Sequence, residues 1–298
     1  MADLPENSWI SPKVLTIIAE QQVTEKGLKD ARTTFLLAIS AGISIGLGFV
    51  FYTTVTTGTA GVAWGLSHLV GGAMFSLGLM LIVVCGGELF TSTVLTTVAR
   101  ASRKITTAQM LKTWFFVYAG NFVGSLLLVA IVFLAGVHLA ADGLWGVNAL
   151  NIAQHKLHHT YIQAIMAGVM CNIMVCLAVW MSFAMKSSFE KAIIVILPVA
   201  LFVATGFEHC VANMFMIPMG MVIQSFAGPE FWTAVGADPS KWADLTLSNF
   251  VFNNLIPVTI GNILGGGVFV GLGHWFIHRK PYLEKETAAV KGSEAQKA

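Results

Sequence analysis

Two long stretches of this chain contain almost no charged side chains. Between residues 33 and 99 only Glu88 is charged, and between residues 113 and 185 only Asp142 and Lys156 are charged. Of the 298 residues, 56% are hydrophobic and 11% are charged, whereas soluble domains contain about 25% charged residues. Because one helical crossing of a bilayer takes about 20 apolar residues, we predict an all-α membrane protein with six transmembrane segments. The segments span approximately residues 33–56, 65–99, 110–137, 160–184, 191–223 and 249–277.

The charge balance and the cysteines exclude several functions. The chain has 17 Lys and Arg against 15 Asp and Glu, for a net charge of +2, so we expect no nucleic-acid partner. Its first 30 residues carry charged side chains in place of the apolar core of a signal peptide, so we do not expect a signal peptide there. The four cysteines, Cys85, Cys171, Cys176 and Cys210, lie in predicted membrane segments without metal-ligand spacing, which is typical of apolar packing residues.

The distribution of Lys and Arg predicts which loops face the cytosol, because cytoplasmic loops of membrane proteins are enriched in these residues. The loops after segments one, three and five contain only Lys156 and Lys241. The other connections and the two ends of the chain contain Lys26, Lys29, Arg32, Arg100, Arg103, Lys104, Lys112, Lys186, Lys191 and the basic residues from Arg279 onward. We therefore predict that both termini are cytosolic.

The chain divides into three predicted regions. Residues 1–30 form a cytosolic N-terminal segment with an amphipathic helix over residues 11–29, in which Pro12 occupies the first turn. The apolar stripe of this helix consists of Val14, Leu15, Ile17 and Ile18. We expect the helix to lie at the inner membrane surface. Residues 31–279 form a transmembrane channel domain, and residues 280–298 form a disordered cytosolic tail.

The two halves of the chain share three short sequence matches in the same order. The matches pair Ala38–Gly42 with Ala164–Gly168, Gly86–Glu88 with Gly206–Glu208, and Gly120–Gly124 with Gly261–Gly265. They fall in segments one and four, two and five, and three and six. Since three crossings reverse the side of entry, we predict two inverted three-helix repeats over about residues 31–137 and 158–278. Chance matching of small residues, which are common in membrane helices, is the alternative.

Segments two and five each contain a glutamate beside glycine, Glu88 and Glu208. A charged side chain in the middle of a membrane segment costs about 2.5 to 3.5 kcal/mol. We therefore predict that both segments are interrupted there, and that backbone donors freed at the glycines satisfy the two structural carboxylates. Inverted repeats commonly place a substrate path at such interrupted helices.

The interruptions predict new half-helices that begin at Thr91–Thr93 and near Cys210–Asn213. Their N-terminal ends carry a partial positive charge and unpaired N–H groups, which attract a small anion. His209 is the one histidine in either interrupted part and can donate a hydrogen bond or a proton to that anion; a packed histidine without such a role is the alternative. Bulky side chains that narrow the path, or simply fill the core, are Phe75, Leu79, Leu89, Phe90 and Phe202.

A histidine-rich segment precedes the fourth membrane segment. His155, His158 and His159 have a spacing that a metal site can use, but no acidic or cysteine partner is adjacent in the sequence, so we expect no metal. Lys156 in the same segment is expected to attract anions to the outer mouth. A solvated start of a helix is the alternative interpretation.

Four segments of the chain resemble the formate/nitrite transporter family, and within it the bacterial formate channels, over about residues 10–280. These segments are Leu69–Gly72, Val84–Thr93, Ala204–Met214 and Asn254–Asn262. The resemblance implies an aquaporin-like protomer with its own pore, a homopentamer in the bacterial inner membrane, and an N-terminal helix associated with gating.

The resemblance also implies roles for individual positions. It places the central polar site at Thr91 and His209. It places constrictions at Phe75, Leu79, Leu89, Phe90, Val175 and Phe202, outer-vestibule polar groups at Lys156 and Asn213, and pore-adjacent asparagines at Asn172 and Asn262.

We therefore expect passage of formate, a small weak-acid anion, through each protomer, without a cofactor and without enzymatic activity. Nitrite, hydrosulfide and other short monocarboxylates remain alternatives, because no residue selects one of them. Channel-like passage and proton-coupled passage through His209 are both open. A water or glycerol pore is a further alternative that would lack a titratable centre, and a membrane enzyme is disfavoured because no hydrolase, metalloprotease or haem-ligand pattern occurs.

Overall fold

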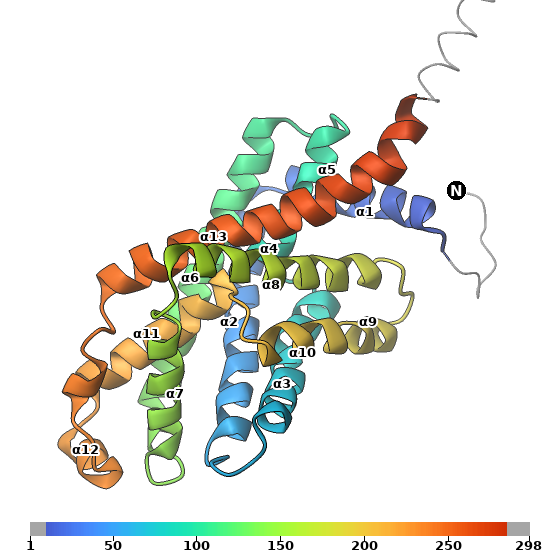
Figure 1. Cartoon of the computed structure of the whole chain (residues 1–298). Helices are drawn as coiled ribbons and strands as arrows, with labels where there is room; N and C mark the ends of the chain where they lie inside the picture. Colours follow the sequence, from blue (N-terminus) through green and yellow to red (C-terminus); the bar gives the residue numbers. More distant parts are fainter. Residues whose placement is uncertain (1–9, 285–298) are drawn as a thin grey trace, which may run out of the picture.

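The computed structural model describes residues 10–284, and within this range the chain consists of helices and connecting loops (Figure 1). The elements of the first half are α1 (Pro12–Leu28), α2 (Ala31–Thr56), α3 (Trp64–Cys85), α4 (Phe90–Thr93), α5 (Thr96–Ala101), α6 (Thr107–Leu134) and η1 (Val137–Leu139). Those of the second half are α7 (Leu144–His155), α8 (Tyr161–Ser182), α9 (Ser188–Ile194), α10 (Ile196–Ala204), α11 (Cys210–Phe226), α12 (Pro229–Val235), η2 (Pro239–Trp242), η3 (Asn249–Leu255), α13 (Ile256–Asn262), η4 (Ile263–Leu272) and η5 (Trp275–Arg279).

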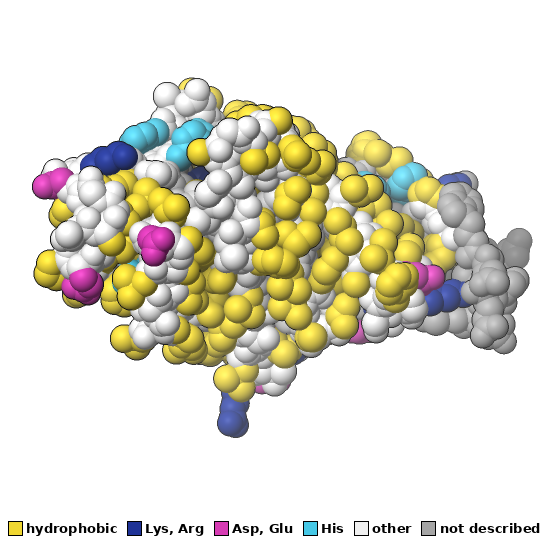
Figure 2. Space-filling view, turned by 90° about the horizontal axis from the view of Figure 1, so that it is seen from below, with side chains coloured by type: hydrophobic (Ala, Val, Ile, Leu, Met, Phe, Trp, Pro, Cys, Tyr) yellow, Lys and Arg dark blue, Asp and Glu magenta, His cyan; other side chains and the backbone are white. Residues whose placement is uncertain are grey.

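Five helices of the described chain are long and apolar enough to cross a membrane. They are α2, α3, α6, α8 and the continuous helix Asn249–Glu284, which contains η3, α13, η4 and η5. Helices α11 and α12, which meet at 104°, are together apolar enough for a sixth crossing. Figure 2 shows a broad apolar surface between two ends at which charged side chains gather. The prediction of an all-α, multi-pass membrane protein is confirmed.

The second and fifth segments are interrupted at equivalent glycines, as predicted. Helix α3 is followed by Gly86, and α10 is followed by Thr205 and Gly206. Both glycines have a left-handed backbone conformation, with φ of 82° and 75°. This conformation is open to glycine but unfavourable for residues with a Cβ atom. Short extended links then lead into α4 and α11.

The inverted repeat is visible in how the first helix of each half packs against the last. A Cβ atom added to Gly124 of α6 would meet the carbonyl oxygen of Ile39, and one added to Gly265 would meet that of Val169. Ile39 and Val169 therefore occupy equivalent places, whereas the sequence match paired Ile39 with Ile165. The predicted register of this pair of segments is wrong by about one helical turn, because small residues on these helices recur at similar spacing and permit both alignments.

Helix α1 begins with Pro12 in its first turn, as the sequence predicts, and the Ser11 side chain accepts the N–H of Val14. Its predicted apolar stripe is not the buried face, since Ile17 is 36% exposed. The buried residues are instead Thr16, Ala19, Glu20, Val23 and Gly27. The difference arises because α1 packs on protein, and not only on a membrane surface.

The two ends of the described chain lie side by side, with α1 next to the end of the last helix (Figure 1). Arg279 donates through Nε and Nη2 to one carboxylate oxygen of Glu20, at 2.9 and 2.7 Å. The last helix continues to Glu284, so the first residues of the predicted tail are helical. The rest of that tail, residues 285–298, lies outside the described residues.

Candidate functional site

The two helix breaks meet at a buried polar pair, Thr91 and His209. Thr91 lies in α4, which follows the first break, and His209 is the N-cap residue of α11, which follows the second. The Thr91 hydroxyl and His209 Nε2 are 3.1 Å apart. Both residues are buried, so the pair lies away from bulk water.

The other nitrogen of the His209 ring determines which group donates within this pair. Nδ1 of His209 accepts the backbone N–H of Ala212 at 3.0 Å and thereby caps α11. A nitrogen that accepts a hydrogen bond carries no proton, so the neutral ring carries its proton on Nε2. His209 therefore donates to the Thr91 oxygen, and the hydroxyl proton of Thr91 is left to point at a third group.

Two side chains of α8 hold the backbone of Thr91 in place. Asn172 Nδ2 and Cys176 Sγ donate to the carbonyl oxygen of Thr91, at 3.0 and 3.1 Å. All three residues are buried. The Asn172 side chain thus fixes the position of Thr91 by binding the backbone carbonyl of Thr91.

Two equivalent asparagines close the helix breaks. Asn121 accepts the N–H of Phe90 at 2.8 Å and donates to the carbonyl oxygen of Glu88, while Asn262 accepts the N–H of Cys210 at 2.9 Å and donates to that of Glu208. Each asparagine also donates to the first helix of its own half. We predicted that the N–H groups at the starts of the half-helices are unpaired. Those of Phe90, Cys210 and Ala212 instead donate hydrogen bonds to side chains of the protein.

Side chains from outside the break neutralise Glu208, which is fully buried. Lys156 Nζ lies 2.7 Å from one carboxylate oxygen and His159 Nε2 lies 3.3 Å from the same oxygen. Asn213 and Asn254 donate to the other oxygen at 2.7 and 3.2 Å. The prediction that freed backbone donors satisfy this carboxylate is wrong, because the backbone N–H groups of Gly206, Phe207 and Glu208 all donate to carbonyl oxygens, that of Glu208 to Ala167.

Glu88 is neutralised in the same way from α1 and the residue after it. Lys26 Nζ and Lys29 Nζ lie 3.0 and 2.6 Å from the two carboxylate oxygens of Glu88. The backbone N–H of Glu88 donates to the carbonyl of Leu37. The prediction of backbone partners is wrong here too, and the ion pairs fasten α1 to the first break.

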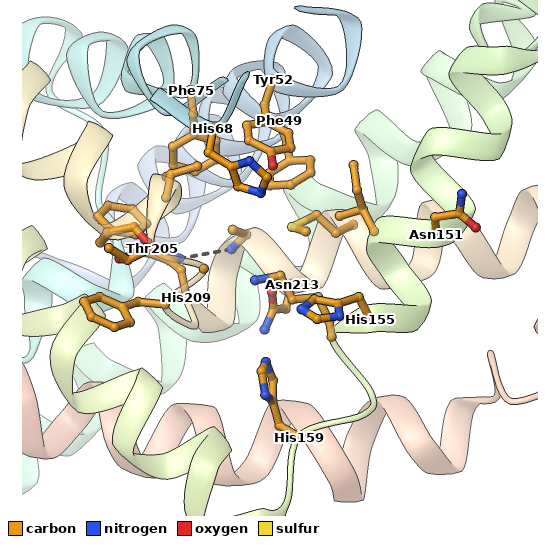
Figure 3. Close-up of a pocket in the computed structure, with 18 of the residues that line it drawn as sticks. Phe49, Tyr52, His68, Phe75, Asn151, His155, His159, Thr205, His209 and Asn213 are labelled. Atoms are coloured by element: carbon orange, nitrogen blue, oxygen red, sulfur yellow. Dashed lines mark hydrogen bonds between the residues drawn. The ribbon is translucent and has the colours of Figure 1, made fainter. Parts of the chain in front are cut away.

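Two cavities approach the central pair from opposite ends of α3. The larger, which we call the α7 cavity, has a volume of about 470 Å³ and is lined by Phe49, Tyr52, Trp64, His68, Phe75, Asn151, Ile152, His155, Lys156, His159, Phe202, Val203, Thr205, Gly206, Phe207, His209, Ala212, Asn213 and Met216 (Figure 3). The smaller, the α1 cavity, has a volume of about 260 Å³ and is lined by Gln22, Glu25, Lys26, Lys29, Ile82, Val83, Gly86, Gly87, Glu88, Ser92, Val179, Ser182, Phe183 and Lys191. His68 and Ile82 of α3 lie about 21 Å apart along the helix at 1.5 Å per residue, so the cavities open toward opposite ends.

The apolar side chains expected at constrictions are all buried, but they lie in different surroundings. Phe75 and Phe202 line the α7 cavity with their ring centres 5.9 Å apart, and Phe202 stacks on His209 at 5.9 Å. Phe90 instead packs against the rings of Trp114 and Tyr118 in α6. The remaining members of this set, Leu79, Leu89 and Val175, are at most 2% exposed and line neither cavity.

Sequence reasoning did not single out several residues that hold this site together. We used Lys26 and Lys29 only to predict how the chain is oriented in the membrane. We considered His159 only as part of a possible metal site, which we judged absent. Asn121 could have been found, because the third sequence match pairs it with Asn262. Asn254 lies in one of the segments that resemble the family, but nothing in the sequence around it predicts its contact with Glu208.

Acidic partners of the histidine segment come from distant parts of the chain. His158 Nε2 lies 2.7 Å from one carboxylate oxygen of Asp244, and Gln154 Nε2 donates to the other carboxylate oxygen. Partial burial raises the pKa of Asp244, but the hydrogen bonds from Gln154 and His158 outweigh it and hold the pKa below its usual value. Within residues 10–284, no three His, Cys, Asp or Glu side chains gather closely enough to hold a metal ion.

These features define a class of protein: a multi-pass membrane protein whose two broken helices meet at a buried polar pair between two cavities, as in transport proteins. Residues 13–276 match the formate/nitrite transporter family, and the chain belongs to that family.

Individual relatives agree with this assignment. The chain is 55% identical to the formate channel FocA of Escherichia coli K12 over 267 residues, which cover 90% of this chain and 94% of that protein. It is 53% identical to the formate channel FocA of Haemophilus influenzae, over 88% of this chain and 93% of that protein. Its structure is similar to that of a pentameric formate channel with formate bound, with a TM-score of 0.80 and 54% identity, over 84% of this chain and 98% of the other.

Proposed function

We propose that this chain is the protomer of a homopentameric formate channel in the bacterial inner membrane. Each protomer conducts formate between the α7 cavity and the α1 cavity, past Thr91 and His209. The observation that carries the proposal is the hydrogen-bonded Thr91–His209 pair, buried at the meeting point of the two helix breaks. The high identity to formate channels and the similarity to a pentamer with formate bound support the substrate and the assembly.

The pair is suited to a small anion because it presents donors in a dry place. His209 Nε2–H and the Thr91 hydroxyl can both donate to a carboxylate oxygen that enters between them. Phe75 and Phe202 exclude water on the side of the α7 cavity, where hydrated ions would lose their hydration shell. Donated hydrogen bonds offset part of the cost of moving an anion into such surroundings.

Proton transfer from His209 to formate requires a change in this geometry. Since Nδ1 accepts the Ala212 N–H, the ring can bind a second proton only after that hydrogen bond breaks. In the conformation described, His209 acts as a hydrogen-bond donor to the anion.

We assign the α1 cavity to the cytosolic side, with both termini in the cytosol. The assignment is supported by the excess of Lys and Arg on α1, on the loops after the second and fourth segments, and after the last helix. The α7 cavity then opens to the periplasm.

Uptake of radiolabelled formate into proteoliposomes tests the central pair. Thr91→Val keeps the shape of the side chain and removes the hydroxyl, while Thr91→Ser keeps the hydroxyl and serves as the matched control. His209→Asn keeps an oxygen that can cap α11 but no longer reaches Thr91. A hydrogen bond to a charged group contributes about 1.5 to 3 kcal/mol, so we expect Thr91→Val and His209→Asn to slow uptake by about 10- to 100-fold, and Thr91→Ser to stay near wild type.

Wild-type uptake rates in both Thr91→Val and His209→Asn would refute the role of the pair. Competition by nitrite and hydrosulfide in the same preparation tests the selectivity for formate. Swelling of the vesicles in glycerol without formate uptake would identify a neutral-solute pore instead.

A further inference from the structure

A hydrogen bond joins the third and sixth membrane segments beside the two helix breaks. The Tyr118 hydroxyl of α6 and the Thr259 hydroxyl of α13 lie 3.0 Å apart, and both residues are partly buried. The third sequence match aligns Gly120 with Gly261, so Tyr118 and Thr259 are equivalent positions of the internal repeat. The two repeats therefore meet here through one side chain from each.

The asparagines that close the helix breaks lie on the same helix faces as these two hydroxyls. Asn121 lies three residues after Tyr118, and Asn262 lies three residues after Thr259. Residues three apart are neighbours on the surface of a helix. Each asparagine holds the backbone of the break in its own half. The hydrogen bond between the hydroxyls therefore fixes the spacing of the two faces that hold the breaks.

On the α6 side, Tyr118 is connected to the central pair through one neighbour. Its ring packs edge to face on that of Phe90, with the ring centres 4.8 Å apart. Phe90 directly precedes Thr91 in α4, and its backbone N–H is held by Asn121. A displacement of Tyr118 is therefore transmitted to Thr91 through a packed ring and one peptide unit.

On the α13 side, Thr259 is connected to the central pair in the equivalent way. The Cys210 side chain lies beside the Thr259 hydroxyl. Cys210 directly follows His209, and its backbone N–H is held by Asn262. The hydrogen bond between α6 and α13 thus completes a bridge whose two ends are the members of the central pair.

We propose that Tyr118 and Thr259 are positioning residues for the passage of formate. Their hydrogen bond holds the two members of the central pair at the spacing at which both can donate to one anion. The inference rests on the proposed function of that pair. Neither Tyr118 nor Thr259 lines the α7 cavity or the α1 cavity, so both act through the pair and not on the anion itself.

The expected effect follows from the strength of such a bond. A hydrogen bond between helices of a membrane protein changes an equilibrium constant by about 3- to 20-fold. Its loss reduces the fraction of protomers in which the central pair is aligned. The apparent affinity for formate falls with that fraction, whereas saturating formate restores the aligned arrangement.

The test measures the KM and the maximal rate of radiolabelled formate uptake into proteoliposomes. Tyr118→Phe keeps the ring that packs on Phe90 and removes the hydroxyl, and Thr259→Val removes the other hydroxyl. Each should raise the KM about 3- to 20-fold and leave the maximal rate within about twofold of wild type. Thr259→Ser keeps the hydroxyl and should retain the wild-type KM. Tyr118→Phe/Thr259→Val should equal either single variant, because the same hydrogen bond is lost in all three.

Two comparisons separate positioning from a general loss of packing. Thr97→Val is the matched control, because it removes a hydrogen bond of the same kind, from α5 to the Gly267 carbonyl of the last helix; it should keep the wild-type KM. In the Thr91→Val background, Tyr118→Phe should raise the KM by less than about twofold, because its effect passes through a pair that is already disabled.

A wild-type KM in both Tyr118→Phe and Thr259→Val would overturn the proposal, as would a full further loss in the Thr91→Val background. Tyr118→Phe should fold, because the freed Thr259 hydroxyl can donate to a carbonyl of its own helix. If it is not recovered as folded protein, Thr259→Val and Thr259→Ser decide the question. Absence of formate uptake by the wild-type protein would refute the proposed function itself, whereas uptake with an unaltered KM in these variants would refute only the positioning role.

Discussion

Removal of Lys156 should destabilise the protein far more than removal of Lys29. The Lys156 side chain is 13% exposed and its partner Glu208 is fully buried, whereas Lys29 is 30% exposed and shares Glu88 with Lys26. Removing one partner of a buried ion pair costs about 3 to 5 kcal/mol. Because Asn213 and Asn254 still donate to Glu208, we expect Lys156→Met to lie at the lower end, about 3 kcal/mol. At about 2 to 4 °C per kcal/mol, the melting temperature falls by about 6 to 12 °C.

The assay is the thermal melt of the purified protein, followed by tryptophan fluorescence. Lys29→Met should lower the melting temperature by no more than about 4 °C. Lys26 still neutralises the buried Glu88, so the loss should be no larger than that of a surface ion pair, about 0 to 1 kcal/mol. The double variant Lys156→Met/Glu208→Gln removes both charges and should recover at least half of the loss. The reasoning is refuted if the double variant melts as low as Lys156→Met, or if Lys29→Met melts as low as Lys156→Met.

Three further predictions concern the helix breaks, the helix packing and the loop before the last helix. Asn121→Ala should destabilise the protein by several kcal/mol, because it leaves buried backbone groups unpaired at about 1 to 3 kcal/mol each; the melting temperature measures the loss, and Asn121→Asp should not restore it. Gly124→Ala should reduce the yield of folded protein, because its Cβ would meet an α2 carbonyl, whereas Gly65→Ala, with open space around it, should be neutral in the same preparation. The lowered pKa of Asp244 implies stability that is present above pH 3.8 and is lost as the pH falls through the lowered value, so melts between pH 5 and 3 should show a fall that Asp244→Asn lacks.

Local features of the sequence were sufficient to predict the architecture. Charge-free stretches predicted the membrane helices, and Gly86 and Gly206 beside the two glutamates predicted the breaks. Both inferences depend on properties of a short segment: the cost of a charge in lipid, and the left-handed backbone that glycine tolerates. The resemblance to a family directed attention to Thr91 and His209, which the structure brings into contact.

The pairing of side chains was decided only in the tertiary structure. The sequence predicted that Glu88 and Glu208 need partners, but Lys26, Lys156 and His159 become those partners through the placement of helices far apart in the chain. Successive residues of a helix point about 100° apart, so a shift of one residue in the register of two packed helices turns a side chain from one neighbour to another. A shift of one turn leaves the apolar pattern almost unchanged, which is why the sequence match aligned the first and fourth segments one turn away from their structural register. Hydrophobicity and glycine therefore determined where this chain crosses the membrane and where it breaks, whereas the rotation and register of packed helices determined which charges meet and which nitrogen of His209 carries the proton.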